Sequence, residues 1–468
     1  MQMRVYKKIS SIASRIRSEV LSRYNPGDRI PSEVEISFLL GESQNRVHRA
    51  ILMLVEEGMI YSSGGRRGMF FTPSISANAN RNKTPVKLKF SLPKVIDGIQ
   101  VRFWKRMAEM FHMIEPSVEI ELVMNPGVAA NIDADCYLLW LPLIECSHFR
   151  EIDLSKIPAV KDMVKDITKT GCQYGKTYGV PLFHSPGVFW AHRNMIRKCG
   201  LRKEDFNDPL DCFRWGDILQ SSKLCAHGFS FFGFIYHAAN YGIDIRREGN
   251  EFRMDPGKVK KFFIECSKHL EHRYTFLNSS THITSLFHRG QQGIKAAYLN
   301  SLSTVEKRFE LLGQPLKKNG FSCQTIFLLA MGKNTQHEDV VYDFLRFLLM
   351  DHIQELFISP ETNFSVINRV YQRQYKELKE SAKVNIPPFD FRGIYPMMDL
   401  DLLAFVARYL YLETVEVLLN FKDIDKAVES ICRINIPERR KYFLENASKS
   451  QQLEYAPYIR YLKEINEL

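Results

Sequence analysis

The feature that most restricts the fold of this sequence is a pair of helices near the N-terminus, each with a strong start and stop signal. Ser32 is followed three residues later by Glu35, the capping-box pattern that begins a helix, and Gly41 is the residue type that ends a helix in the left-handed conformation. Ser43 caps a second helix directly afterwards, and Gly58 ends it. Two helices joined by so short a turn favour a helix-turn-helix unit.

The segments on either side extend this pattern. Residues 4–22 carry apolar side chains at helical spacing, which predicts a preceding amphipathic helix. After the second capped helix, the sequence MIYSS, GGRRG, MFFTP predicts a strand, a tight turn and a strand, with Arg66 and Arg67 at the tip. The complete order predicts a winged helix-turn-helix domain over residues 1–72.

The apolar and polar residues of the two capped helices predict a buried and an exposed side. The residues expected to face inward are Ile36, Leu39, Leu40, Val47, Ala50, Ile51 and Leu54. The polar residues in the first two turns of the second helix are Gln44, Asn45, Arg46, His48 and Arg49. Such a helix fits the DNA major groove, where Gln and Asn can read adenine and Arg can read guanine or hold phosphate. A charged face that binds another protein is the alternative.

At these residues the sequence resembles the GntR family of bacterial transcription regulators. The resemblance spans YNPGDRIPSEVEISFLLGESQNRVHRAILMLVEEGMI and the glycine wing. It implies dimeric binding to a palindromic, double-stranded operator and adds Arg29, beside the P-S-E motif, as a DNA-contacting residue. The full predicted DNA-binding set is Arg29, Ser32, Ser43, Gln44, Asn45, Arg46, His48, Arg49, Arg66 and Arg67. Gln44 stands where the family usually has arginine, so the base preference is expected to differ.

Charge and cysteine content set the context of this domain. The chain has a formal net charge of +11, and residues 1–90 hold 15 Lys and Arg against seven Asp and Glu. Residues 73–85 are small and polar and predict a linker. The nine cysteines show no C-x-x-C pair, and we find neither a signal peptide nor a run of 18 apolar residues. We therefore expect a cytoplasmic protein that does not contact membranes. The resemblance to the GntR family implies that it is a homodimer.

The remaining body, residues 86–468, begins with a strand, a helix and two further strands, which predicts a parallel sheet and an α/β fold. It contains no recognisable catalytic motif. The glycines of GCQYGKT are one residue too close for a phosphate-binding loop, and Cys266, His269 and His272 lie along nearly two turns of one predicted helix, a poor arrangement for a metal. We expect no enzyme activity, no cofactor and no metal.

The order of elements in the body resembles the maltose-binding-like solute-binding proteins of ABC sugar importers. The resemblance rests on FWKRMAEMFHMIEPSVEIELV, DADCYLLW, GKTYGVPLFHSPGVFWAHRNMIRKCGL, FHRGQQGIKAAYLNS and VVYDFLRFLLMDHIQELF. It implies a two-lobed, type II periplasmic-binding-protein fold. The expected boundaries are 86–187 and 326–370 for lobe one, 188–325 for lobe two, and 371–468 for C-terminal helices.

Aromatic residues along these motifs predict a carbohydrate site, because aromatic faces stack on the apolar faces of sugar rings. The candidate ligand-binding residues are Trp140, Phe183, His184, Trp190, Tyr236, Tyr298 and Asn300. The preferred hypothesis is a transcription regulator whose DNA affinity responds to a small carbohydrate effector. A solute receptor of an importer and an enzyme that acts on carbohydrate are the alternatives.

Overall fold

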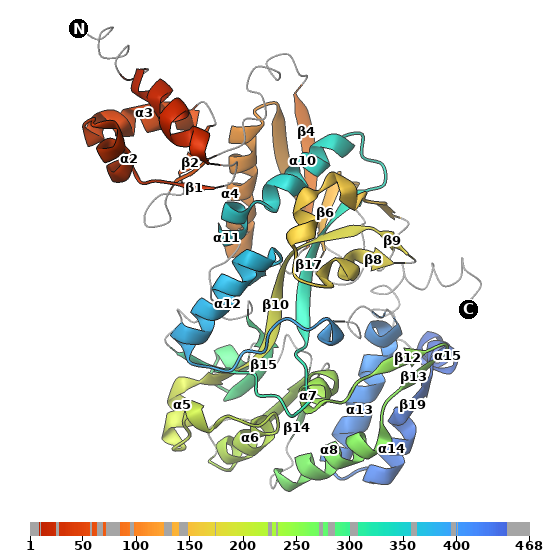
Figure 1. Cartoon of the computed structure of the whole chain (residues 1–468). Coiled ribbons are helices and arrows are strands. Elements are labelled where there is room, and N and C mark those ends of the chain that lie inside the picture. Colours follow the sequence, from red (N-terminus) through yellow and green to blue (C-terminus); the bar gives the residue numbers. More distant parts are fainter. Residues whose placement is uncertain are drawn as a thin grey trace.

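The structure is a computed structural model. It describes residues 9, 11–24, 28–56, 59–62, 69–71, 85–93, 98–125, 133–139, 148–173, 175–222, 227–230, 233–270, 275–278, 286–299, 308–356, 363–394, 399 and 401–446. Their buried apolar side chains form three large cores. One lies in the N-terminal domain, one holds lobe one together with residues of β10 and β16 beyond the crossing, and one lies in lobe two. Figure 1 shows the N-terminal domain and the two lobes, coloured along the sequence.

Within the described residues, the N-terminal domain has the predicted helices and wing strands in the predicted order, and in addition a strand, β1, that was not predicted. Its elements are a π-helical turn (Ile16–Val20), a 3-10 turn (Leu21–Arg23), β1 (Arg29–Ile30), α2 (Glu33–Leu40), α3 (Gln44–Glu56), β2 (Ile60–Ser62) and β3 (Met69–Phe71). The three strands form an antiparallel sheet in the order β1-β3-β2. This sheet and the helices enclose one core, so the domain is a winged helix-turn-helix.

Lobe one is built around a mixed sheet with its helices packed against it. The path of this sheet is β15-β10-β17-β6-β4-β5. The first strands, β4 (Val86–Pro93), β5 (Val118–Asn125) and β6 (Cys136–Leu139), pair in parallel, which confirms the predicted β–α–β opening. The helices are α4 (Gly98–Ile114), α10 (Glu338–Leu348), α11 (Asp351–Leu356) and α12 (Asn368–Ala382). Small strands are β7 (Phe149–Arg150), β8 (Cys172–Gln173), β9 (Lys176–Thr177) and β18 (Phe364–Ser365).

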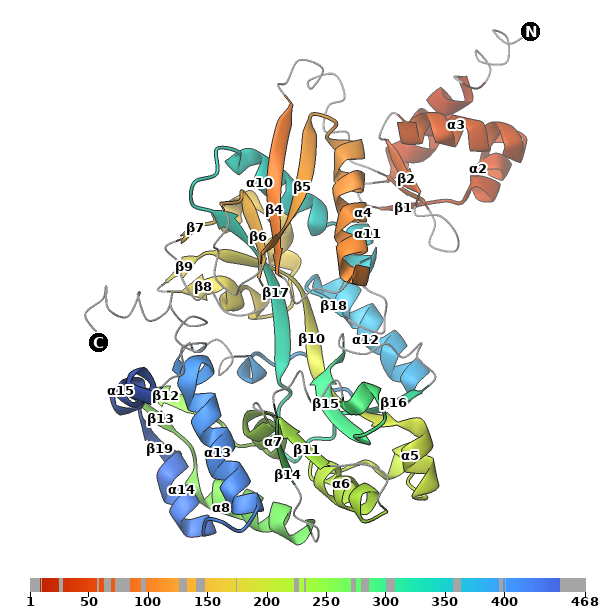
Figure 2. The ribbon, with the colours of Figure 1, turned by 180° about the vertical axis from the view of Figure 1, so that it is seen from behind.

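The strand β10 (Gly179–His192) belongs to both lobes. Its first half, up to Pro186, pairs with β17 (Gln324–Gly332) in lobe one. From Gly187 onward it pairs with β15 (Ile294–Tyr298) and β16 (Phe309–Gly313). Figures 1 and 2 show β10 and β17 running from one lobe toward the other. The two lobes therefore share a continuous hydrogen-bonded strand.

Lobe two combines the middle of the chain with C-terminal helices. Its helices are α5 (Arg193–Lys198), α6 (Asp211–Ser221), α7 (Gly233–Tyr241), α8 (Pro256–Lys268), α13 (Ala407–Leu418), α14 (Ile424–Cys432) and α15 (Ile436–Asn446). Its smaller strands are β11 (His227–Ser230), β12 (Arg246–Glu248), β13 (Glu251–Arg253), β14 (Thr275–Asn278) and β19 (Arg433–Asn435). Residues of α13 and α14 share one core with many of the buried residues between 189 and 323, whereas α12 packs in the core that contains lobe one.

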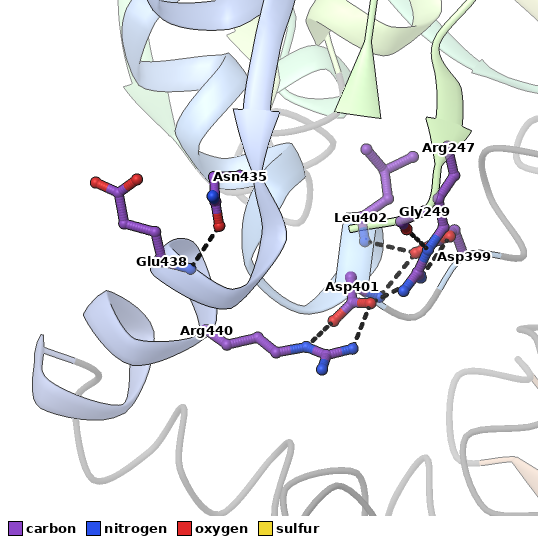
Figure 3. Close-up of polar contacts among 8 residues, drawn as sticks. All are labelled: Arg247, Gly249, Asp399, Asp401, Leu402, Asn435, Glu438 and Arg440. Carbon is purple, nitrogen blue, oxygen red and sulfur yellow. Dashed lines mark hydrogen bonds and ion pairs between the residues drawn. The ribbon is translucent and has the colours of Figure 1, made fainter. Parts of the chain in front are cut away.

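A buried ion network fastens these C-terminal helices to lobe two (Figure 3). Asp401 accepts two hydrogen bonds from the guanidinium of Arg440, at 2.7 and 2.8 Å, and one from Arg247 at 2.7 Å. Asp399 accepts a further bond from Arg247 at 3.0 Å and two from the backbone amides of Asp401 and Leu402. The network joins β12, the residues just before the π-helical turn Leu402–Val406 that leads into α13, and α15.

Candidate functional site

The two helices of the N-terminal domain meet in a turn that is fixed by its caps. The Ser32 amide donates to Glu35 Oε2 at 2.7 Å, and the Glu35 amide donates to Ser32 Oγ at 3.3 Å, so the predicted capping box is formed. Gly41 has a φ of 63°, the left-handed conformation that glycine adopts at little cost. These caps set where α2 starts and ends, and α3 begins at Gln44, three residues after Gly41.

One side of α3 is buried and the other is free to meet a ligand. Val47, Ala50, Ile51 and Leu54 lie in the domain core, as predicted. The exposed residues of its first two turns are Gln44, Asn45, Arg46, His48 and Arg49. The α3 surface thus offers two amides, two guanidinium groups and an imidazole to the exterior, a set that suits base edges and phosphates.

Two acidic side chains accompany this polar face. Glu42 lies 3.5 Å from an Arg46 nitrogen, and Glu33 lies 2.9 Å from His48 Nδ1. Arg49 forms no ion pair with another residue that the structure describes. Among the basic side chains of α3, Arg49 is thus without an ion pair to a described residue, whereas Arg46 and His48 each lie beside a carboxylate.

The remaining predicted DNA-binding residues surround α3. Arg29 is exposed on β1, where it pairs in register with Phe70 of the wing strand β3. Ser32 and Ser43 are exposed at the starts of α2 and α3. Arg66 and Arg67 lie outside the described residues. Leu39, which we expected to face inward, is 59% exposed, so that expectation is wrong: Ile36 and Leu40, one helical turn apart, already fill the inner side of α2.

Three of the candidate ligand-binding residues lie in the interior of the body. The Phe183 ring stacks on Phe327 with centroids 4.4 Å apart. His184 Nδ1 lies 2.7 Å from Gln324 Oε1, and burial lowers the pKa of His184 to about 4, despite that hydrogen bond. Trp190 is completely buried. All three are buried, and their role as ligand contacts stays a prediction.

The other candidates lie where β10 passes into lobe two or outside the described residues. Tyr236 on α7 is buried, and its ring fills the space beside Gly187, where an added Cβ would lie 2.2 Å from the Tyr236 hydroxyl. Tyr298 pairs in register with Gly187 and is only half-buried; burial raises its pKa. The two tyrosines therefore flank the point at which β10 changes partners. Trp140 and Asn300 lie outside the described residues.

Comparison with known families identifies the N-terminal domain. Residues 8–70 match the family model of bacterial regulatory proteins of the gntR family. We call residues 8–70 the GntR domain after this match. Its fold and its exposed α3 face agree with the DNA-binding role of that domain. No curated protein matches the chain in sequence.

The body beyond the GntR domain has the fold of maltose-binding-like proteins. The maltose-bound MalE3 of T. maritima matches with a TM-score of 0.53 and 15% identity, over 76% of this chain and 100% of that one. A cyclic alpha-maltosyl-1,6-maltose binding protein from Arthrobacter globiformis matches with a TM-score of 0.57 and 14% identity, over 74% and 97%. The GacH receptor of Streptomyces glaucescens matches with a TM-score of 0.55 and 12% identity, over 78% and 100%. The body is therefore a two-lobed, maltose-binding-protein-like α/β domain.

Some features of the site carried no local sequence signal. Glu33 and His48 are 15 residues apart, and Gly187 and Tyr236 are 49 apart, so only the tertiary fold brings each pair together. Within the described ranges, no cluster of three or more His, Cys, Asp or Glu side chains could hold a metal ion. None of the helices there is both long enough and apolar enough to span a membrane.

Proposed function

We propose that this protein is a cytoplasmic transcription regulator that binds operator DNA through its GntR domain and a small carbohydrate through its two-lobed body. The observation that carries this proposal is the joining, in one chain, of a GntR domain with an exposed polar α3 and a fold shared with sugar-binding proteins. The proposed role of the body is binding rather than catalysis. We propose Trp140, Tyr298 and Asn300 as ligand contacts, and we propose that Tyr236 supports β10 at Gly187.

The regulatory step of the proposal is a change in lobe arrangement. A ligand shifts a protein between two states only by binding one of them more tightly. Because β10 passes through both lobes, a ligand held between residues of the two lobes can favour one relative orientation. The proposed coupling transmits that preference to the GntR domain and changes operator affinity.

Replacement of Arg49 tests the DNA-binding half of the proposal. Arg49→Ala is expected to weaken operator binding about 10- to 100-fold and to reduce the salt dependence of binding by about one counterion, because a free guanidinium on α3 is lost. Arg46→Ala is expected also to alter base preference. Fluorescence anisotropy on DNA duplexes selected from a random pool provides the measurement. Arg202→Ala, at an exposed arginine of lobe two, is the matched control; equal affinity of Arg49→Ala and Arg202→Ala would reject the assignment of α3.

A thermal-shift screen tests the ligand-binding half. We expect selected mono- or oligosaccharides, such as maltose and maltotriose, to raise the melting temperature of the full chain in a concentration-dependent manner, with about 2.7 kcal/mol of stabilisation at a hundredfold excess over Kd. Trp140→Ala is expected to abolish this shift and to leave the melting temperature without sugar unchanged. Tyr442→Ala, at an exposed aromatic residue of α15, serves as the control. The absence of a shift with every sugar would refute the carbohydrate assignment.

The alternative function is that of a solute receptor for an ABC importer. The structural matches, which include the GacH receptor, favour it because they cover 74–78% of this chain. The GntR domain favours regulation instead, since a receptor has no use for an operator-binding helix. Sequence-selective binding of duplex DNA by the full chain distinguishes the two functions.

A further inference from the structure

Two ion pairs join neighbouring helices of lobe one on the side where the GntR domain lies. Arg369 of α12 donates a hydrogen bond to Asp351 Oδ1 of α11 at 2.7 Å, and Arg373 of α12 donates one to Glu355 of α11. The partners are four residues apart on each helix, so the two ion pairs lie one helical turn apart. Figures 1 and 2 both show α11 beside the GntR domain at the strand β1.

Asp28, the residue before β1, adds a third charge to the first of these ion pairs. The hydrogen bond to Asp351 raises the pKa of Arg369, and the nearby charge of Asp28 adds to that rise. Asp162 of lobe one approaches the same guanidinium at 3.7 Å. Because Asp28 belongs to the GntR domain and Arg369 to α12, this attraction acts between the domain and the body.

Arg29 adds a third charge to the second ion pair. Burial raises the pKa of Glu355, and the charges of Arg373 and Arg29 oppose that rise. The carboxylate of Glu355 thus attracts one arginine of its own lobe and one arginine of the GntR domain. We call the four residues that face each other between domain and body the ionic contact: Asp28, Arg29, Glu355 and Arg369.

Charge, rather than apolar burial, is what the described residues offer where the GntR domain meets lobe one. The apolar core of the GntR domain and the core that contains lobe one have no described residue in common. The side chains of Glu355 and Arg369 are 35% and 63% exposed, so water screens their attraction to the GntR domain. An exposed ion pair shifts an equilibrium by no more than roughly fivefold. The ionic contact is therefore weak enough to open and close.

The helix that carries Arg369 also reaches the region where the two lobes meet. Tyr375 Oη on α12 donates to the Ile386 carbonyl at 2.6 Å. The neighbouring Asn385 carbonyl accepts from the Gln314 amide at 2.7 Å, directly after β16. A change in the arrangement of the lobes would therefore reach the ionic contact through one helix.

Arg29 has two competing anionic partners. Its guanidinium faces Glu355 in this structure, and a phosphate of DNA requires the same group. We propose that the ionic contact docks the GntR domain on α11 and α12 in a state of low operator affinity, and that its release frees Arg29 for DNA. This inference rests on the proposed function and specifies where the body restrains the GntR domain.

Two substitutions of opposite charge test the inference in the full-length protein, on a duplex selected from a random pool. Glu355→Gln removes an anion and Arg369→Gln removes a cation, yet each is expected to raise operator affinity roughly two- to fivefold, because each weakens docking. An effect of net charge alone would separate the two variants, since loss of a cation weakens binding to phosphates. Glu151→Gln and Arg202→Gln alter exposed ion pairs elsewhere in the body and are the matched controls, expected to bind as the unmodified protein does.

Small-angle X-ray scattering without DNA measures the docking itself. Glu355→Gln and Arg369→Gln are each expected to have a larger radius of gyration than the unmodified protein, because a released GntR domain moves away from lobe one. Asp28→Asn leaves the body unaltered and is expected to give the same increase. This third variant shows that a local disturbance of α11 or α12 is not the cause.

The other outcomes contradict the inference in distinguishable ways. Weaker operator binding by Arg369→Gln would overturn it, and so would scattering curves that match the unmodified protein in all three variants. A larger radius of gyration with unchanged operator affinity would show docking without inhibition and would also overturn it. Failure of the unmodified protein and of every variant to select a DNA sequence would reject the proposed function, and the inference with it.

Discussion

Asp401→Asn is expected to lower the unfolding free energy of lobe two by about 3–5 kcal/mol, the usual cost of removing one charge from a buried ion pair. The Asp401 side chain is 1% exposed and Arg440 is 7% exposed, so water cannot replace the lost carboxylate. Arg247 retains Asp399, but the Arg440 guanidinium would stay buried without its paired anion. Denaturant unfolding, monitored by hydrogen exchange in α13–α15, measures the effect.

Two further variants separate the charge effect from a general loss of contacts. Asp401→Leu combined with Arg440→Met removes both charges and is expected to recover much of the stability, because apolar side chains of similar size can replace a buried ion pair. Asp205→Asn breaks an exposed ion pair with Arg202 and is expected to change stability little. If Asp401→Asn unfolds at the same denaturant concentration as the unmodified protein, the network does not hold the C-terminal helices in place.

Gly187→Ala is expected to destabilise the protein by about 3 kcal/mol, at the upper end for overpacking. The added Cβ would lie 2.2 Å from the Tyr236 hydroxyl and 2.4 Å from two ring carbons, and Tyr236 is itself buried on α7. The Gly187 amide also donates to the Cys323 carbonyl at 2.7 Å, so the strand cannot move away without losing that bond. The clash lies where β10 leaves lobe one. Thermal unfolding of Gly187→Ala and of the unmodified protein measures the loss of stability.

A double-mutant cycle tests whether Tyr236 is the cause. Tyr236→Ala is destabilising on its own, because a buried ring is removed, but Gly187→Ala added to it is expected to cost almost nothing further. Gly257→Ala is the matched control: its Cβ would meet only Asp255 Oδ1, at 3.3 Å, in the first turn of α8. Additive effects of Gly187→Ala and Tyr236→Ala would show that the cost arises from backbone conformation instead.

The sequence predicted the GntR domain well, because its signals are local. The capping box of Ser32 and Glu35, the left-handed Gly41 and the inward side of α3 each depend on residues within one or two helical turns. Leu39 was misassigned because spacing alone cannot tell which edge of an apolar helix is covered. In the body, the parallel pairing of the first strands was also predictable, since the β–α–β order can be recognised along the chain.

The candidate ligand site was harder to predict for a physical reason. A buried aromatic residue and a ligand-stacking aromatic residue have the same local pattern, and only the tertiary fold shows that the ring of Phe183 faces Phe327 or that Trp190 has no exposed surface. The network of Arg247, Asp399, Asp401 and Arg440 spans almost 200 residues of sequence and gave no signal at all.

Lobe two is built from the middle and the end of the chain. This bears on the order in which the domains can fold during synthesis. The core of the GntR domain comes from residues 12–69, so it is complete early in synthesis. The core of lobe two needs residues up to Ile436, and Arg440 of the buried ion network lies later still in the sequence. A nascent or prematurely ended chain would therefore carry a finished GntR domain without a finished lobe two. Under the proposed function, completion of lobe two, and not folding of the GntR domain, is the event after which DNA binding can respond to a ligand.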